Sequence, residues 1–509
     1  MRVQHVSYGE SDLHTADAEE TDSDPETTVL LHRTTLGGSS TDPLPFDGDS
    51  VLQRVGANDG RPFVLGPDGS YDLHLNRFLR DLKNWGVLSE NSRIAYSTDV
   101  MLYCRFLHES RGGKSIWDSD GADLRAYKAV RLHGSGPGSV SVATWNRSIA
   151  ALDKWVQWSL YEELLSAEPF RYVDKTVVSP QGPKRVRVNA AAEPEVPRQP
   201  IRFLSHEDFM LWRDIGLRGL LPDGSPDPAW RGRNGERNAL FADLLICTGM
   251  RLGEATSLLT AELPPVTGKR VLGDITVSAA VAKRNRARTV YVRPRVARDL
   301  HHYVGIERDE LMQRRRVEGV YEACADRLPV RRANRHALAL DSGTSWSYSR
   351  IGTMDRARLL RVDGHGRASG PLSLWLGENG LPLRAGTWQS VFRRANERCS
   401  VLGLDFDVHP HTLRHSFAVH MLGLLLRQTV RALGMREDRR FTHAEVKRLL
   451  IGNPLRRLQL LLGHRHEATV YTYLDVLDEA QEIVLAALDD WDEQAAAFEQ
   501  VRPETEELR

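Results

Sequence analysis

The chain has 509 residues, of which 41% are hydrophobic and 27% are charged, and its formal net charge at pH 7 is zero. This length suits roughly two to four domains with sizeable cores. No apolar run approaches the roughly 20 residues that span a bilayer, and the first residues are acidic rather than signal-like, so we expect a cytoplasmic protein without membrane contact. The four cysteines are scattered, and we expect them to be reduced and structural.

The charges are unevenly distributed along the chain. Residues 1–50 hold eleven acidic residues against two arginines, and residues 474–509 hold twelve against two. The remainder therefore carries roughly +19, which is the electrostatic footprint of a body that binds phosphates. Solvated surface charge is the alternative, but it explains single clusters better than it explains this separation.

The first two hundred residues divide into three predicted segments. Residues 1–68 are acidic and rich in Ser, Thr, Gly and Pro, with little apolar periodicity, so we expect them to be mostly disordered. Residues 69–172 show apolar residues at helical spacing and predict a small helical domain. Residues 173–200 contain five prolines and predict an extended linker.

Two groups of side chains in these segments have competing interpretations. Trp145, Trp155 and Trp158 stand in one predicted helix, where aromatic residues more often face a core than a nucleic acid. The predicted linker carries the basic residues Lys184, Arg185 and Arg187. These suit contact with phosphates, although a merely solvated linker explains them equally well.

From residue 201 onward, helical and strand patterns alternate. Ser205 is placed to begin a helix, and an apolar helix face around Leu244 leads into a turn at Thr248–Gly249 that presents Arg251. Alternating apolar residues near 275–279 and 290–292 predict two strands around a turn at Arg284 and Asn285.

Two later segments are expected to be insertions. Residues 305–370 are Arg-rich and irregular, and residues 424–451 separate two histidine-containing motifs. After residue 475, the apolar residues of segment 476–509 lie at helical spacing among acidic ones, which predicts an acidic amphipathic helix and tail.

The C-terminal third of the chain concentrates groups that suit a phosphodiester. His411 and Arg414 lie three residues apart, on one face of a predicted helix. His464 follows a Gly at the end of an apolar helix, and Tyr473 stands nine residues later. Arginine holds phosphate oxygens, histidine exchanges protons near neutrality, and a tyrosine hydroxyl serves as a covalent nucleophile. Together they could break and remake a phosphodiester without a metal.

These motifs resemble those of the tyrosine recombinase (phage integrase) family. The matching stretches are Thr248-Gly249-Met250-Arg251-Leu252-Gly253-Glu254, His411-Thr412-Leu413-Arg414-His415, and Leu462-Gly463-His464 with Tyr473 nine positions on. Lys283 occupies the lysine position of the family's β-hairpin. The resemblance implies a fold that is mainly α with a small β-sheet: a helical core-binding domain over 69–172 that clamps DNA, and a mixed α+β catalytic domain over 201–475.

The resemblance also implies how the phosphate is held. Arg251 and Arg414 bind its non-bridging oxygens and stabilise the charge of the transition state. Lys283 protonates the departing 5′ oxygen, and His464 donates a further hydrogen bond. Glu254 orients Arg251 or its neighbours.

The nucleophile implied by the resemblance is Tyr473, which becomes joined to the 3′ phosphate. His411 exchanges a proton with it, and His415 is a supporting residue. Tyr471 is the competing nucleophile, but it lies two residues early for the family spacing. The crowded histidines, which include His409, could suggest a metal site, yet no carboxylate stands at ligand spacing.

The implied function is site-specific DNA recombination without metal, ATP or cofactor, in a cytoplasmic, nucleoid-associated protein. Arg284, Arg286 and Arg288 are expected to contact DNA. The expected partners are double-stranded DNA, three further copies of the chain on paired sites, and accessory DNA-bending or directionality proteins. A type IB topoisomerase shares the chemistry, while a metal-dependent nuclease and a regulator without catalysis are alternatives from other classes. The C-terminal helix packs on its own domain or docks on a neighbouring protomer.

Overall fold

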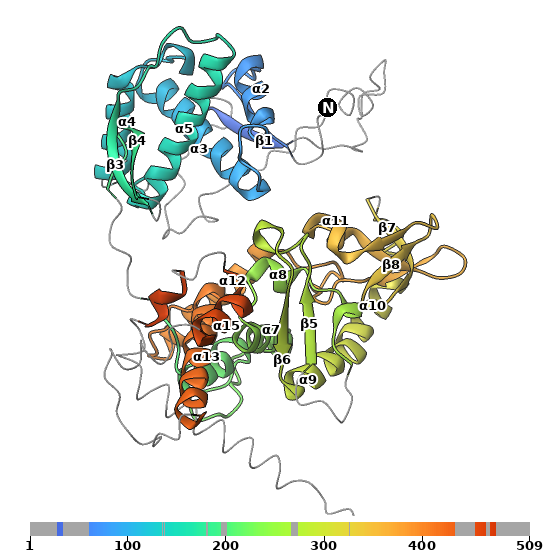
Figure 1. Cartoon of the computed structure of the whole chain (residues 1–509). Coiled ribbons are helices and arrows are strands. Elements are labelled where there is room, and N and C mark those ends of the chain that lie inside the picture. Colours follow the sequence, from blue (N-terminus) through green and yellow to red (C-terminus); the bar gives the residue numbers. More distant parts are fainter. Residues whose placement is uncertain are drawn as a thin grey trace, which may run out of the picture. The chain divides into compact units, whose positions relative to one another are not determined.

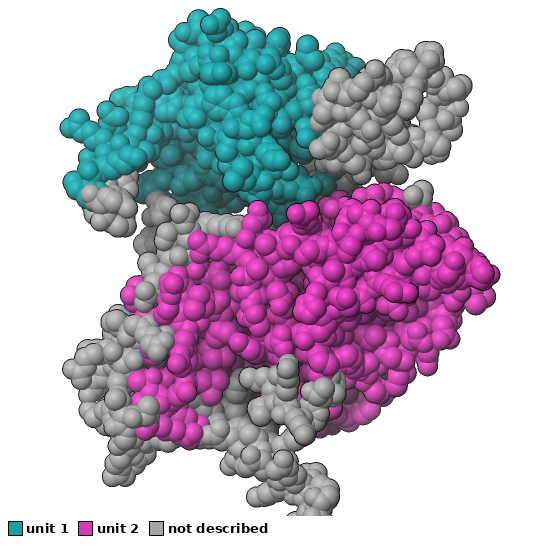
Figure 2. Space-filling view, turned by 45° about the vertical axis from the view of Figure 1, so that its right-hand side comes forward, with its two compact units in different colours: residues 1–198 teal, residues 199–509 magenta. Residues whose placement is uncertain are grey.

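The computed structural model describes residues 28–33, 61–134, 136, 138–179, 182–194, 201–265, 273–324, 326–432, 453–464 and 469–474. The chain divides into two compact units, Met1–Arg198 (unit 1) and Gln199–Arg509 (unit 2), which Figure 1 and Figure 2 show. The predicted C-terminal helix and most of the second predicted insertion lie outside the described residues. No described helix has the length and apolar character that a membrane span requires.

Unit 1 is built around a helical bundle. Its helices are α2 (Leu73–Asp81), α3 (Glu90–Ser110), α4 (Gly121–His133) and α5 (Val142–Tyr161). Each begins at an Asp or Ser whose side chain accepts a hydrogen bond from a backbone N–H of the first turn. Trp145, Trp155 and Trp158 are fully buried on α5, which confirms the prediction that they belong to a core.

Two short strands lie within residues 1–68, a segment that we expect to be mostly disordered. Strand β1 (Leu30–Arg33) pairs antiparallel with β2 (Pro62–Leu65). Val29, Phe63 and Val64 are buried, so these residues contribute apolar area to the core of unit 1.

A hairpin occupies most of the predicted linker, so the prediction for residues 173–200 is wrong there. Strand β3 (Tyr172–Ser179) pairs with β4 (Gly182–Asn189) along its whole length. A two-stranded hairpin has an outer edge on each strand, where proline costs no ladder hydrogen bond. Its base is anchored to α5, because Tyr172 Oη and Asn189 Nδ2 both donate to Asp153 Oδ1, at 2.9 and 2.8 Å.

The main core of unit 2 lies between helices and one hairpin (Figure 1). Its elements are α6 (His206–Trp212), a π-helical turn (Arg213–Leu217), α7 (Gly235–Thr248), α8 (Leu252–Thr256), β5 (Gly273–Val277), β6 (Arg288–Val292), α9 (Pro294–Gly305), α12 (Ala385–Val401) and the start of α13 (Pro410–Ala432). Helix α15 (Asn453–Leu462) packs with the rest of α13 in a second apolar cluster. Ser205 caps α6, and the predicted hairpin is present as β5 and β6. Stacked Phe241 and Trp388 rings, 3.6 Å apart at their centroids, join α7 to α12.

Residues 305–370, the first expected insertion, form regular helices and strands although their sequence pattern is irregular. The segment contains α10 (Glu307–Val317), β7 (Leu328–Ala333), β8 (Ala337–Leu340), β9 (Ser345–Ser347), α11 (Thr353–Arg358), β10 (Leu359–Val362) and β11 (Ala368–Pro371). The strands form one sheet in the order β11-β10-β7-β8-β9, in which only the β10–β7 pair is parallel. The predicted fold class is confirmed, with this sheet added to the hairpin.

Candidate active site

Gly249 brings the first arginine motif against the histidine motif. It ends α7 with φ +61°, a left-handed conformation that favours glycine. A Cβ at this position would also collide with the ring of Phe417 on α13. The carbonyl of Gly249 accepts a hydrogen bond from Arg414 Nη1, so the turn that precedes Arg251 directly contacts the second arginine.

Glu254 contacts Arg251, the residue that it is expected to orient. Its Oε1 accepts from Arg251 Nη1 at 2.9 Å, and its Oε2 accepts from the Arg251 backbone N–H at 2.8 Å. Burial raises the pKa of Glu254, but hydrogen bonds and charge from Arg288 and Arg251 outweigh burial and leave the pKa below its ordinary value. The carboxylate is therefore ionised at neutral pH.

Arg288 forms a bidentate ion pair with the same Glu254 carboxylate. Its Nη1 and Nη2 donate to Glu254 at 2.9 and 2.6 Å, and its Nε donates to the carbonyl of Leu461 at 3.0 Å. The Arg288 side chain is only 6% exposed. The prediction that Arg288 contacts DNA is therefore wrong, whereas Arg286 is exposed in the same turn region. The side chain of Arg284 lies outside the described residues.

Arg414 and His464 contact each other. Arg414 is 1% exposed, and its Nη2 lies 2.6 Å from the carbonyl oxygen of Leu462 and 3.1 Å from His464 Nε2. Burial, and then the charges of Arg251 and Arg288, lower the pKa of Arg414 to about 9, so it remains charged at pH 7. Burial, and then the charges of Arg414 and Arg251, lower the pKa of His464 to about 3. A neutral His464 accepts from Arg414 at Nε2 and carries a proton at Nδ1.

Tyr473 contacts a different histidine from the one expected. His415 Nδ1 lies 3.0 Å from Tyr473 Oη, so the histidine at the hydroxyl of Tyr473 is His415 rather than the expected His411. The two histidines are one helical turn apart on α13, with ring centroids separated by 4.3 Å. Tyr473 is 3% exposed, whereas Tyr471 is 39% exposed.

The charges around Tyr473 are consistent with a phosphate site. Burial raises the pKa of Tyr473, and the nearby positive charges of Arg414 and Arg251 oppose part of this rise. Burial, followed by His411 and Arg414, lowers the pKa of His415 to about 4. At neutral pH the pair is thus a protonated phenol beside a neutral imidazole that can accept its proton.

Lys283 projects from the turn between β5 and β6. It begins a short 3₁₀ turn, Lys283–Asn285, and Asn285 closes this turn with φ +55°, a conformation that asparagine tolerates better than most residues. Burial, Arg414, Arg251 and Lys283 together lower the pKa of His411. The charge of Lys283 therefore reaches the same site as the two arginines.

Two family models match the chain. The model described as "Phage integrase, N-terminal SAM-like domain" matches residues 75–163, and the model "Phage integrase family" matches residues 229–424. The chain belongs to the phage integrase family of tyrosine recombinases.

Relatives of this recombinase are similar over most of their length. Tyrosine recombinase XerC of Roseiflexus castenholzii is 24% identical over 78% of this chain and 88% of its own. Tyrosine recombinase XerD of Shewanella oneidensis is 21% identical over 80% and 92%. Two solved structures are also similar to this chain. XerH site-specific recombinase bound to difH is 14% identical with a TM-score of 0.39, and the match covers 80% of this chain and 83% of XerH. The Tn1549 transposon integrase in complex with circular intermediate DNA is 12% identical with a TM-score of 0.43, and the match covers 79% of this chain and 94% of the integrase.

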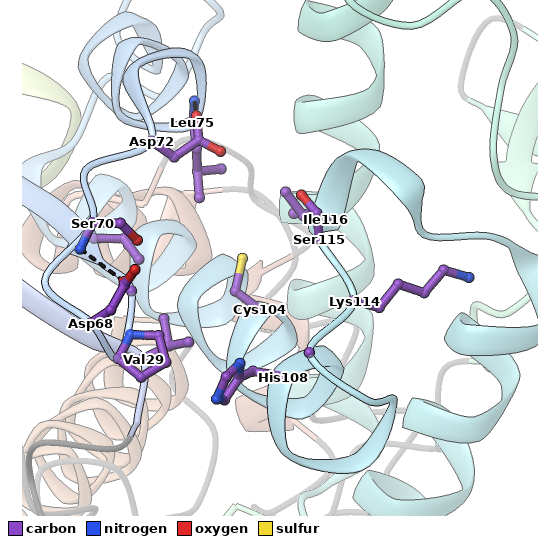
Figure 3. A pocket seen from close by; sticks show the side chains of 14 residues that line it. Val29, Asp68, Ser70, Asp72, Leu75, Cys104, His108, Lys114, Ser115 and Ile116 are labelled. Atoms are coloured by element: carbon purple, nitrogen blue, oxygen red, sulfur yellow. Dashed lines mark hydrogen bonds between the residues drawn. The ribbon is translucent and has the colours of Figure 1, made fainter.

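Metal ligands, a cavity in unit 1 and the cysteines are the other candidate sites in the recombinase. Among the residues that the structure describes, no three His, Cys, Asp or Glu side chains are grouped as a metal site requires. A cavity of about 660 Å³ in unit 1 is lined by Asp72, Cys104, His108 and Lys114 among others, with the Cys104 sulfur toward the hollow (Figure 3). Burial raises the pKa of Cys104 to about 12, so this thiol is not a nucleophile at neutral pH. All four cysteines are free, as predicted.

Proposed function

We propose that this recombinase cuts and rejoins DNA through a covalent link between Tyr473 and a 3′ phosphate. The observation that carries the proposal is the hydrogen bond between Tyr473 Oη and a neutral His415, within the charge field of Arg251 and Arg414. A buried phenol with a base at its hydroxyl and two guanidinium groups nearby suits attack on an anionic phosphorus.

In the proposed cleavage step, Tyr473 Oη forms a bond to phosphorus and the bond from phosphorus to the 5′ oxygen breaks. The phenolic proton passes to His415, and Lys283 gives a proton to the departing 5′ oxygen. Arg251, Arg414 and the Nδ1 proton of His464 bind the non-bridging oxygens. In rejoining, a 5′ hydroxyl of the partner strand attacks the same phosphorus, and the protons return along the same routes. The phosphodiester energy is conserved, so the proposed reaction requires no ATP.

The buried charge supports a phosphate as the missing partner. Arg414 is buried, and its hydrogen-bond acceptors among the described residues are two carbonyls and one imidazole, with no carboxylate. Burying a cation without an anion is costly, and a phosphate brought between Arg414 and Arg251 would compensate that cost. Loss of one such donor commonly costs about 3 to 4 kcal/mol of transition-state stabilisation.

The proposed substrate is double-stranded DNA carrying specific sites. Exchange between two duplexes requires four strand cuts, which we assign to four protomers on paired sites, with accessory DNA-bending or directionality proteins as further partners. One structural relative is described as a lambda integrase tetramer bound to a Holliday junction. A tetramer on paired sites should appear as a complex of four protomers in native mass measurements.

The decisive test compares Tyr473→Phe with Tyr471→Phe on a nicked suicide substrate. Tyr473→Phe is expected to lose the protein–DNA adduct on a denaturing gel while it binds DNA within a few-fold of wild type, because only a hydroxyl is removed. Tyr471→Phe is the matched control and should keep the adduct, with or without EDTA. An adduct in Tyr473→Phe would disprove the assignment, and relaxation of supercoiled plasmid without joining to new partners would favour a topoisomerase.

A further inference from the structure

Arg356 is a buried arginine in the sheet-containing segment that follows α10. It lies on α11, is 1% exposed, and forms a bidentate ion pair with Glu262. Its Nη1 donates to Glu262 Oε2 at 2.6 Å and its Nη2 donates to Oε1 at 3.0 Å. Its Nε donates to the carbonyl of Ile351 at 3.1 Å.

The other two donors of Arg356 reach the segments that present the active-site cations. Nη1 donates to the carbonyl of Ser257, the residue that ends α8 after Arg251, at 3.2 Å. Nη2 donates to Ser278 Oγ, directly after β5, at 3.0 Å. All five N–H groups of the guanidinium therefore have acceptors.

Ser278 leads directly into the turn that carries Lys283. The Ser278 carbonyl accepts from the backbone N–H groups of Val281 and Ala282, at 3.2 and 3.0 Å. Ala282 then accepts from the backbone N–H of Asn285 at 3.0 Å, across Lys283. Ser278 and Ala282 are both 5% exposed, so this turn has little freedom to shift independently of its anchor.

The geometry of this contact requires arginine specifically. Lysine would keep the positive charge against Glu262, but a compact ammonium has three donors and cannot reach all these acceptors in one plane. The Arg356→Lys variant therefore keeps the positive charge but loses the contacts that fix the orientation of the turn.

We propose that Arg356 is a positioning residue for Lys283, through which the segment from α10 to β11 controls delivery of the proton to the departing 5′ oxygen. The proposal rests on the proposed function, in which Lys283 is the proton donor. It assigns this added segment a part in the chemistry, although none of its side chains is proposed to contact the scissile phosphate.

The test uses the full-length protein and two suicide substrates, one with the natural 5′ oxygen and one with sulfur at that bridging position. A thiolate leaves without protonation, because a thiol is far more acidic than an alcohol. Arg356→Lys is expected to cleave the oxygen substrate at least about tenfold more slowly than wild type, while its rate on the sulfur substrate stays within about threefold. Binding of uncut DNA should be unchanged.

Two further variants make the result interpretable. Lys283→Ala should show the same dependence on the leaving group, with a larger defect on oxygen. Arg358→Lys is the matched control, because Arg358 ends the same helix but pairs with Asp326 and Asp355 at the surface. Both substrates should be cleaved at the wild-type rate by this control.

The outcomes separate the inference from the proposed function. If Lys283→Ala is rescued by sulfur and Arg356→Lys is equally slow on both substrates, the inference is overturned and the role of Lys283 stands. If Lys283→Ala is not rescued, the proposed proton donor is wrong and the inference falls with it. If Arg356→Lys folds poorly, Ser278→Ala is used instead, because it removes only the acceptor next to the turn. The inference is also overturned if Ser278→Ala does not slow cleavage of the oxygen substrate selectively.

Discussion

At the scale of single residues, the proposed nucleophile Tyr473 and its proposed base His415 would together set the pH range of cleavage. Burial, His411 and Arg414 lower the pKa of His415 to about 4, while burial raises the pKa of Tyr473. A base works in its neutral form, so His415 is competent above its own pKa and is lost as pH falls through that value. The phenol needs this base, because it does not ionise by itself near neutrality.

We therefore predict that the single-turnover cleavage rate is insensitive to this histidine from about pH 5 upward and falls as pH decreases through about 4. His415→Ala should lower the rate at pH 7 by roughly 10²-fold, within the usual range for a lost general base. His411→Ala is the matched comparison, since it stands one turn away on α13. A larger loss in His411→Ala than in His415→Ala would return the proton-acceptor role to His411.

At the scale of elements, one buried carboxylate ties three segments together. Glu254 on α8 pairs with Arg288 on β6, and Arg288 also donates to the Leu461 carbonyl near the end of α15. Gly463 follows α15 with φ +66°, and a Cβ there would lie 3.0 Å from Arg288 Cδ. This clamp, made of Glu254, Arg288 and the Leu461 carbonyl, joins the helix that follows Arg251 to the helix that precedes His464.

Breaking the clamp should affect stability as well as activity. We predict that Arg288→Gln lowers the free energy of unfolding of unit 2 by about 3 to 5 kcal/mol, because Glu254 stays buried with only part of its compensation. Cleavage should slow with it, since Arg251 loses its fixed partner. Urea unfolding and single-turnover cleavage measure the two effects.

Arg286→Gln is the control for that experiment, because Arg286 is exposed in the same turn region. It should leave the unfolding midpoint unchanged, weaken DNA binding and reduce its salt dependence by about one phosphate contact. The interior assignment of Arg288 fails if Arg288→Gln instead behaves like Arg286→Gln in both measurements.

At the scale of the whole molecule, both units carry basic side chains that we expect to contact DNA. In unit 1, Lys184 and Arg185 are exposed on β4, whereas Arg187 is engaged with Glu168 at 2.5 and 2.7 Å and lies over the Tyr172 ring. A paired arginine contributes less net attraction to a phosphate than an unpaired one. We therefore expect Lys184 and Arg185 to contribute more to DNA affinity than Arg187.

We predict that Lys184→Ala with Arg185→Ala weakens binding to specific and non-specific DNA alike. The slope of log affinity against log salt should become shallower by roughly 1.8, since each lost phosphate contact contributes about 0.9. Arg187→Ala, whose partner Glu168 is on the same unit, should change the slope less. An unchanged slope in the double variant would show that the hairpin does not contact phosphate.

The sequence by itself determined the features that depend on near neighbours. The helix faces and the caps at Ser205 and Gly249 follow from spacings of a few residues, while the set Arg251, Lys283, Arg414, His464 and Tyr473 follows from short motifs that resemble those of the family. Burial of Trp145, Trp155 and Trp158 was predictable for the same reason, because helical periodicity places apolar side chains on one face. Such local signals need no knowledge of distant segments.

Only the tertiary structure decided which of several equivalent side chains enters the site. His411 and His415 share a face of α13, and the choice between them depends on where Tyr473, 58 residues beyond His415, packs against that face. Arg286 and Arg288 stand in one basic run, and Arg288 is interior because Glu254 and α15 lie on its side. Likewise, the sheet of residues 328–371 depends on pairings between strands, two of which, β7 and β10, have an apolar pattern interrupted by arginines. Burial and ion pairing depend on long-range contacts, which spacing along the chain does not specify.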